Sequence, residues 1–87
     1  MRFEFDPSKA AGNLRKHGVS FADAEGVFYD PLALHRPDRD EGEQRFVAVG
    51  LGNAGQILVV AYTLRAEDIR LISARRATPK ERRNYEG

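Results

Sequence analysis

The first part of the chain changes from the two-residue period of a strand to the wider spacing of a helix. Residues 3–5 alternate apolar, polar and apolar, which predicts a short strand with both aromatic rings on one face. Asp6 precedes a proline and is a good N-cap, and Gly18 supplies the left-handed residue that ends many helices. We therefore expect the first helix at residues 7–17.

A second helix is predicted after Ser20, which is a suitable N-cap with Asp23 in the first turn. Apolar residues then recur at the spacing of one helix face, at Phe21, Ala24, Val27 and Phe28. Asp30 and the proline after it end this pattern. The stripe predicts that the second helix packs on the core.

From residue 32 onward the pattern is typical of strands. Residues 32–36 form a weak strand, and the polar, acidic stretch 37–43 predicts an exposed loop. Residues 45–51 and 56–64 are strong strands separated by a Gly-Asn-Ala-Gly turn. The second of them is apolar on both faces at residues 57–61, so we expect it at the centre of the sheet, covered on both sides.

The last strand is predicted at residues 68–74 and follows a short connection at 65–67, so that three consecutive strands form an antiparallel meander. Thr78 and Glu81 then match a capping box, with a proline between them at the first helical position. This pattern predicts a short helix at residues 78–86.

The predicted element order is β-α-α-β-β-β-β-α. It describes an α+β fold in which two N-terminal helices pack on one face of a mainly antiparallel sheet. The short C-terminal helix is expected near the other face or at an edge. A chain of 87 residues can bury one hydrophobic core, so residues 1–87 are expected to form a single domain.

Composition excludes several classes of site. The chain has 41% hydrophobic and 31% charged residues, as ordinary globular domains do. It contains no cysteine and two histidines, so we expect no disulfide, no metal site and no cofactor. The N-terminus lacks the apolar segment of a signal peptide, and no apolar run has the length of a membrane span. We therefore expect a cytoplasmic protein that does not bind membranes.

The net charge of +1 conceals an uneven distribution. Residues 1–43 carry six Lys and Arg against nine Asp and Glu, whereas residues 44–87 carry eight against four. Six cations lie close together near the end of the chain: Arg70, Arg75, Arg76, Lys80, Arg82 and Arg83. Such a cluster favours binding of polyanions, above all nucleic acid. The alternative is a solvated surface with ion pairs inside the chain.

Two adjacent arginines at the end of the last strand are candidates for phosphate binding. The side chains of Arg75 and Arg76 should point to opposite faces, because successive residues of a strand alternate. A guanidinium matches a phosphate bidentately and could stabilise a pentacoordinate transition state. The rival explanation for either arginine is an ion pair with Glu4, Glu81 or a helix end.

Residues able to exchange protons lie in two helices. His17 ends the first helix and could donate a proton to a substrate, or it could only cap the helix; His35 is expected to be solvated. Helical spacing makes Tyr85 a neighbour of both Glu81 and Arg82. The capping box already explains Glu81, and Tyr85 could stack on a base or close the edge of the core. Cleavage of RNA needs no protein nucleophile, because the 2′-hydroxyl attacks the adjacent phosphorus.

Two motifs carry a resemblance to a known family. Residues 13–21 contain Lys-His-Gly-Val-Ser-Phe, and residues 69–78 contain Ile-Ser-Ala-Arg, followed by Glu81, Arg82 and Tyr85. With Phe5-Asp6-Pro7 they resemble the BrnT family of bacterial type II toxins over nearly the whole chain. Two positions depart from the usual pattern: Phe5 replaces a common tryptophan, and Arg76 stands where lysine is frequent.

The resemblance implies a RelE-like fold and a metal-independent endoribonuclease that inhibits translation and growth. It also implies an antitoxin of the BrnA type with a ribbon-helix-helix region, and binding of operator DNA only by the toxin-antitoxin complex. Because catalytic residues differ among RelE-like proteins, it does not identify the acid or the base.

The leading hypothesis is a ribonuclease toxin in which Arg75 or Arg76, together with Arg82, binds the scissile phosphate. In this hypothesis His17, Glu81 or Tyr85 transfers protons. The RNA is held by four further cations, Lys16, Arg70, Lys80 and Arg83. The hypothesis requires that these guanidinium groups converge on a common pocket. The alternatives are a module that binds an antitoxin or nucleic acid without cleavage, and an inactive family member.

Overall fold

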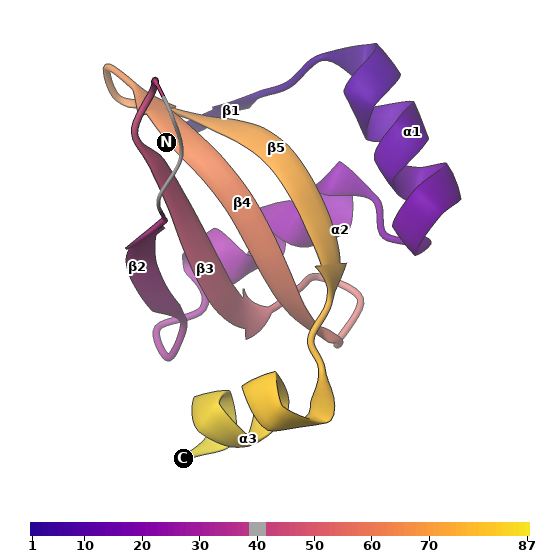
Figure 1. Cartoon of the computed structure of the whole chain (residues 1–87), viewed down its shortest axis with the longest axis vertical. Coiled ribbons are helices and arrows are strands. Elements are labelled where there is room, and N and C mark those ends of the chain that lie inside the picture. Colours follow the sequence, from indigo (N-terminus) through magenta and orange to yellow (C-terminus); the bar gives the residue numbers. More distant parts are fainter. Residues whose placement is uncertain (39–41) are drawn as a thin grey trace.

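A computed structural model describes residues 1–38 and 42–87 and contains a five-stranded sheet with strand order β1-β5-β4-β3-β2 (Figure 1). The elements are β1 (Arg2–Glu4), α1 (Pro7–His17), α2 (Phe21–Glu25), the 3-10 helix η1 (Gly26–Tyr29), β2 (Leu34–Asp38), β3 (Arg45–Leu51), β4 (Ile57–Arg65), β5 (Asp68–Arg76) and α3 (Pro79–Glu86). The predicted α+β class and element order are confirmed. No helix in the described residues is long and apolar enough to cross a membrane.

The sheet is mixed rather than wholly antiparallel. Strands β2 to β5 form antiparallel pairs, but β1 lies parallel to β5, with Arg2 opposite Asp68. Strand β4 occupies the middle of the sheet, and both of its faces are covered at Val59 and Val60, as its apolar sequence predicts.

Several predicted boundaries were wrong, among them the end of the last strand, because β5 runs to Arg76 instead of residue 74. The first strand ends at Glu4, so Phe5 lies beyond it and packs edge-to-face on Phe21, with the ring centroids 5.4 Å apart. The second helix changes to a 3-10 helix at Gly26. Strand β2 continues to Asp38, inside the predicted loop, because its pairing with β3 overrides the weak strand propensity of its sequence. The rest of that predicted loop includes residues 39–41, which lie outside the described residues.

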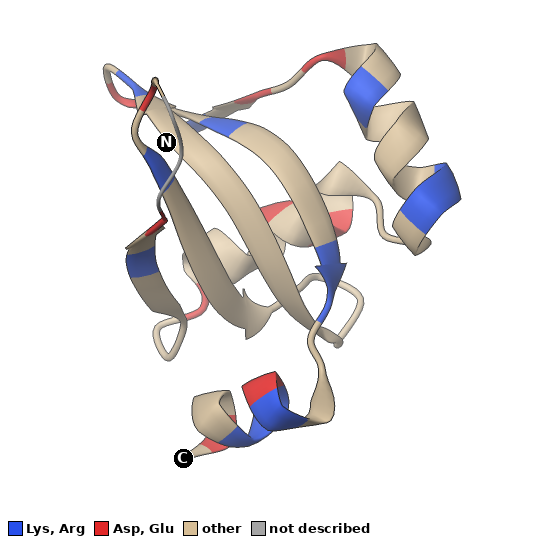
Figure 2. Cartoon of the chain, viewed as in Figure 1, with Lys and Arg blue, Asp and Glu red and all other residues tan. Residues whose placement is uncertain are grey.

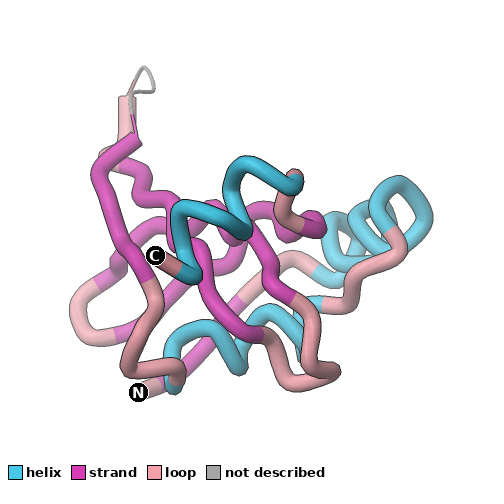
Figure 3. Tube along the Cα trace, turned by 90° about the horizontal axis from the view of Figure 1, so that it is seen from below, coloured by secondary structure: helices cyan, strands magenta, loops and turns pink. Residues whose placement is uncertain are grey.

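The helices lie on both sides of the sheet. Helix α2 and η1 cover one face, α1 lies beside β5, and α3 lies on the other side near the ends of β3 and β4 (Figures 1 and 3). The buried core lies between the sheet and α2 and consists of Val19, Phe21, Ala24, Val27, Ala48, Leu58, Val60, Tyr62, Ile69, Leu71 and Ala74.

The turn between β3 and β4 is held against α2. The backbone N–H of Asn53 donates to the carbonyl of Asp23 at 3.0 Å, and its side-chain amide donates to the carbonyl of Ala22 at 2.9 Å. Gly26 permits this approach, because a Cβ atom there would lie 2.6 Å from the Asn53 nitrogen. The position of the turn is therefore fixed by α2.

Asn13 connects α1 to the sheet. Its side-chain amide donates to the carbonyls of Val19 and Ala74 at 3.0 and 2.9 Å, and its side-chain oxygen accepts from the Ala74 N–H at 3.1 Å. Asn13 is only 7% exposed. Since β1 pairs with β5 no further than Arg70, the Asn13 amide takes the place of a strand partner at Ala74.

We expect Asn13→Ala to lower the free energy of unfolding by about 2–4 kcal/mol, because it leaves the buried N–H and C=O of Ala74 without partners. Urea denaturation measures this change. Asn84→Ala removes the same group from an exposed position of α3 and should alter stability by less than about 0.5 kcal/mol. Equal effects of the two substitutions would contradict the role assigned to Asn13.

Candidate functional site

Arg75 and Glu81 form a bidentate ion pair between the end of β5 and α3. The two guanidinium nitrogens of Arg75 donate to the two carboxylate oxygens of Glu81 at 2.8 and 2.9 Å. Glu81 also accepts from the backbone N–H of Thr78 at 2.8 Å and completes the predicted capping box. The hydrogen bond from Arg75 is the main cause that lowers the pKa of Glu81 to about 2. The ion pair considered as the rival explanation for Arg75 is therefore present.

Arg76 and Arg82 line a common pocket. In the register of β4 and β5, Arg75 lies opposite Val59 and Arg76 opposite Leu58, so the two adjacent arginines do face opposite sides of the sheet. The pocket has a volume of about 470 Å³ and is lined by Gly55, Gln56, Ile57, Arg76, Ala77, Arg82 and Glu86. Within the described residues neither Arg76 nor Arg82 makes an ion pair, which leaves both guanidinium groups available to an anion.

Glu86 is a residue of this pocket that the sequence reasoning missed. It lies four residues after Arg82 and therefore on the same side of α3. The spacing could have identified it, but Glu81 offered the more obvious signal because of the capping box. Glu86 places one carboxylate beside two guanidinium groups.

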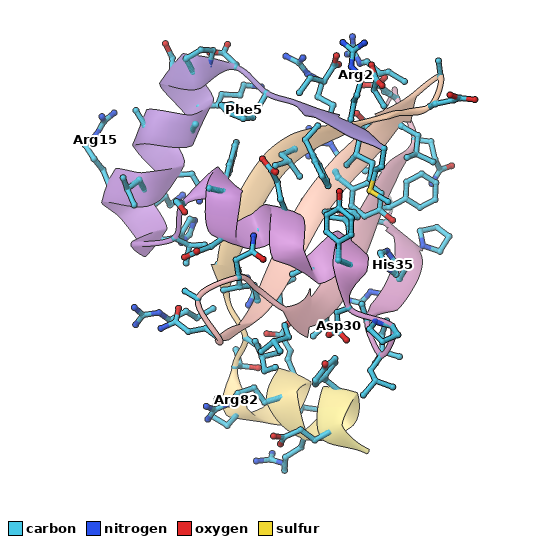
Figure 4. All side chains as sticks on the ribbon, turned by 180° about the vertical axis from the view of Figure 1, so that it is seen from behind. Arg2, Phe5, Arg15, Asp30, His35 and Arg82 are labelled. Carbon is cyan, nitrogen blue, oxygen red and sulfur yellow. The ribbon has the colours of Figure 1, made fainter. Side chains whose placement is uncertain are left out.

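Tyr85 anchors the other end of α3. Its hydroxyl donates to Asp30, and this hydrogen bond raises the pKa of Tyr85 to about 12. Asp30 also accepts from the backbone N–H groups of Leu32 and Leu51, at 2.9 and 2.8 Å. Burial alone would raise the pKa of Asp30, but the three hydrogen bonds together lower it. Asp30 lies between the sheet and α3 in Figure 4.

The remaining predicted residues lie away from the Arg76 and Arg82 pocket. His17 and Lys16 are in the last turn of α1, and neither side chain makes a hydrogen bond or ion pair within the described chain. Lys80 and Arg83 are exposed on α3. Arg70 is in β5 and contacts Glu4 at 3.4 Å. The roles of all these residues in binding or proton transfer stay predictions.

His35 has a structural partner. Its Nδ1 lies 2.8 Å from the hydroxyl of Tyr62, and its ring packs near Phe28. These contacts hold the imidazole near η1 and β4, and His35 also lines a pocket of about 240 Å³ together with Glu81 and Asn84. Within residues 1–38 and 42–87, no three His, Asp or Glu side chains are arranged as metal ligands.

Comparison with solved structures shows which class of protein shares this fold. The fold is similar to the crystal structure of the Brucella abortus ribonuclease toxin, BrnT, with a TM-score of 0.67 and 28% sequence identity. The alignment covers 90% of this chain and 97% of that one. No curated protein sequence matches the chain. The α+β fold is thus shared with a small ribonuclease toxin.

The family follows from the sequence match. The family model described as "Ribonuclease toxin, BrnT, of type II toxin-antitoxin system" matches residues 5–81. The chain therefore belongs to the BrnT family of ribonuclease toxins, and the resemblance found in its motifs is confirmed.

The Arg75 and Glu81 pair predicts a pH dependence of stability. The pKa of Glu81 is about 2 in the folded protein and 4.5 ordinarily. The ion pair therefore stabilises the fold fully above about pH 4.5, and this stabilisation is lost as the pH falls toward 2. Over that window the thermal midpoint of the parent should approach that of Glu81→Gln. Glu67→Gln, at an exposed turn, should leave the pH profile of the thermal midpoint unchanged. If the profile of Glu81→Gln runs parallel to that of the parent between pH 4.5 and 2, the prediction is refuted.

Tyr85→Phe should lower the free energy of unfolding by about 1–2 kcal/mol, because Asp30 loses a hydrogen-bond donor. Amide hydrogen exchange should also become faster in α3, since this contact holds the end of the helix. Tyr29→Phe is the matched control, because Tyr29 is 66% exposed and has no hydroxyl partner in the described chain. If both variants exchange at the parent rate, Tyr85 does not anchor the helix.

Proposed function

We propose that this chain cleaves RNA without a metal ion, with the scissile phosphate bound between Arg76 and Arg82. The observation that carries the proposal is the pocket that both guanidinium groups line while neither is paired with a carboxylate. Two guanidinium groups can neutralise the charge that develops on a pentacoordinate phosphorus. Membership of the BrnT family supports RNA as the substrate.

In the proposed reaction the 2′-oxygen of the RNA forms a bond to the adjacent phosphorus, and the bond from phosphorus to the 5′-oxygen breaks. Glu86 accepts the proton of the 2′-hydroxyl, because its carboxylate lines the same pocket. The leaving 5′-oxygen takes up a proton from water, because His17, the donor expected from the sequence, lies outside this pocket. The products are a 2′,3′-cyclic phosphate and a free 5′-hydroxyl.

The contacts of Arg75, Glu81 and Tyr85 support a positioning role for these three residues. Arg75 and Glu81 join the first turn of α3 to β5, and Tyr85 joins its last turn to Asp30. In α3 Arg82 lies between Glu81 and Tyr85, and Glu86 directly follows Tyr85. The attachments therefore hold the proposed phosphate-binding and proton-accepting groups in place relative to Arg76.

The cellular role follows from the family. We propose that RNA cleavage inhibits translation and growth, and that a BrnA-type antitoxin with a ribbon-helix-helix region neutralises the chain. Operator DNA is then bound only by the toxin-antitoxin complex. Membership of a type II toxin-antitoxin family supports an antitoxin partner.

One observation favours the alternative of a binding module without activity. Arg75, the arginine of the family-like motif, is already occupied by Glu81 in a bidentate pair, so it is not free to clamp a phosphate. A module of this kind would bind RNA or an antitoxin and form no cleavage product.

Incubation of antitoxin-free protein with RNA in EDTA distinguishes these functions. The parent should cleave RNA, and Arg76→Gln and Arg82→Gln should each lower the single-turnover rate by about 100-fold or more, as expected when a charge-stabilising donor is removed. Arg15→Gln should cleave at the parent rate, because Arg15 points outward from α1 (Figure 4). Glu86→Gln tests the proton transfer from the 2′-hydroxyl, and His17→Ala tests whether His17 takes part in cleavage although it lies outside the pocket.

Intact RNA after incubation with the folded parent protein would favour the binding module. Cleavage that requires Mg²⁺ would contradict the metal-independent reaction. If Arg76→Gln and Arg82→Gln cleave as fast as Arg15→Gln, the phosphate does not bind in this pocket.

A further inference from the structure

A second basic pocket lies at the opposite end of β5 from Arg76. It has a volume of about 240 Å³, and its polar lining comes from Lys9, Glu43, Arg45, Thr63, Arg65 and Arg70. These residues belong to α1, the segment before β3, and strands β3, β4 and β5. Figure 2 shows basic segments at the upper ends of these strands and on the neighbouring turn of α1.

Thr63 forms part of this pocket and has an unsatisfied hydroxyl group. The residue is 1% exposed, and its Oγ1 atom is buried without a hydrogen-bond partner. Buried hydroxyl groups are normally paired, so an unpaired one in a ligand-sized pocket indicates a missing polar partner. Thr63 lies directly opposite Arg70 in the register of β4 and β5, which places both residues together.

The charges around Thr63 favour an anion. Besides Arg45, which has an interaction of its own, three cationic side chains and one carboxylate line the pocket. Arg65 contacts Glu43 through one nitrogen at 3.4 Å, and Arg70 contacts Glu4 in the same way at 3.4 Å. Both contacts are longer than the bidentate pair of Arg75 and Glu81, so each guanidinium keeps donors for a further acceptor.

We infer that this pocket, which we call the Thr63 pocket, binds a backbone phosphate of the RNA at a distance from the cleaved bond. The inference rests on the proposed ribonuclease function. The span from Arg70 to Arg76 along β5 is about 20 Å, from six residues at ~3.3 Å each. One phosphate group cannot occupy both pockets, but a single RNA strand can carry phosphates to both.

Binding to a 2′-O-methyl RNA oligonucleotide tests this inference, because the probe has no free 2′-hydroxyl and cannot be cleaved. By fluorescence anisotropy at low salt, Arg70→Gln and Lys9→Gln should weaken binding about tenfold relative to Arg15→Gln. Each should also reduce the slope of log affinity against log salt by about 0.7, the value for one single-strand phosphate contact. Glu4→Gln should strengthen binding, because it frees Arg70 from its carboxylate partner.

Thr63→Val separates phosphate binding from a structural role. Because the hydroxyl has no partner in the free protein, its replacement by a methyl group should leave the thermal midpoint equal or higher. Binding of the probe should nevertheless weaken, and Thr63→Ser should restore it. A lower midpoint with unchanged affinity would show that the hydroxyl serves folding alone and would overturn the inference.

The outcomes distinguish this inference from the proposed function. If Arg82→Gln abolishes cleavage but the Lys9, Thr63 and Arg70 variants bind like Arg15→Gln, the Thr63 pocket is overturned and the ribonuclease function stands. If the parent cleaves no RNA but these variants still lose probe affinity, the Thr63 pocket stands as an RNA-binding site. If they bind the probe normally and lose affinity only for the co-purified antitoxin, the pocket receives a protein carboxylate, and the inference is wrong.

Discussion

The hydrogen bonds of Asn13 are the constraint on which the arrangement of the chain depends. Strand β5 pairs with β4 along both of its ends, with one irregularity at Ala61 and Tyr62, but β1 covers only the first part of its other side. The Asn13 amide satisfies both backbone groups of Ala74 and also holds the carbonyl of Val19, so it joins α1, the connection to α2 and the sheet. An apolar residue at this position could fill the space but could not replace the missing strand. Arg75 and Arg76 are the two residues after Ala74 and end β5, so the Asn13 hydrogen bonds also fix the position of this strand end.

Helix α3 is attached by polar contacts rather than by a buried apolar face. None of its residues is buried, and its two ends are held by the Arg75 and Glu81 pair and by the Tyr85 and Asp30 hydrogen bond. A partly exposed ion pair contributes modestly to stability. Its effect here is geometric, because it fixes α3 close to the end of β5 and so brings Arg82 beside Arg76. The two cationic pockets then lie at opposite ends of one strand, in a chain with almost no net charge.

Local signals in the sequence predicted most elements of the fold, because each has a direct physical cause. Asp6, Gly18 and Thr78 occupy the cap positions expected of them, and Gly18 has the left-handed φ of 69°. The parallel pairing of β1 was not predicted, because it joins residues 66 positions apart and no local sequence pattern indicates it.

The cluster of arginines near the end of the chain indicated a basic surface. The sequence could not show that Glu81 binds Arg75 while Arg76 and Arg82 remain unpaired in the described chain. The Thr63 pocket was missed for the same reason, because its cations come from separate elements and are close only in space.

The parallel pairing of β1 with β5 also determines when a newly made chain can fold. Among the strands of the described residues β1 is synthesised first, yet its neighbour in the sheet, β5, is synthesised last. Ala74, the partner of Asn13, likewise follows it by 61 residues in the chain. Strand β1 and helix α1 must therefore wait for β5 before they can dock, because these contacts join residues that are distant in sequence. The pocket between Arg76 and Arg82 is therefore assembled only after β5 and α3 have been made, and a growing chain that ends before Arg82 lacks it.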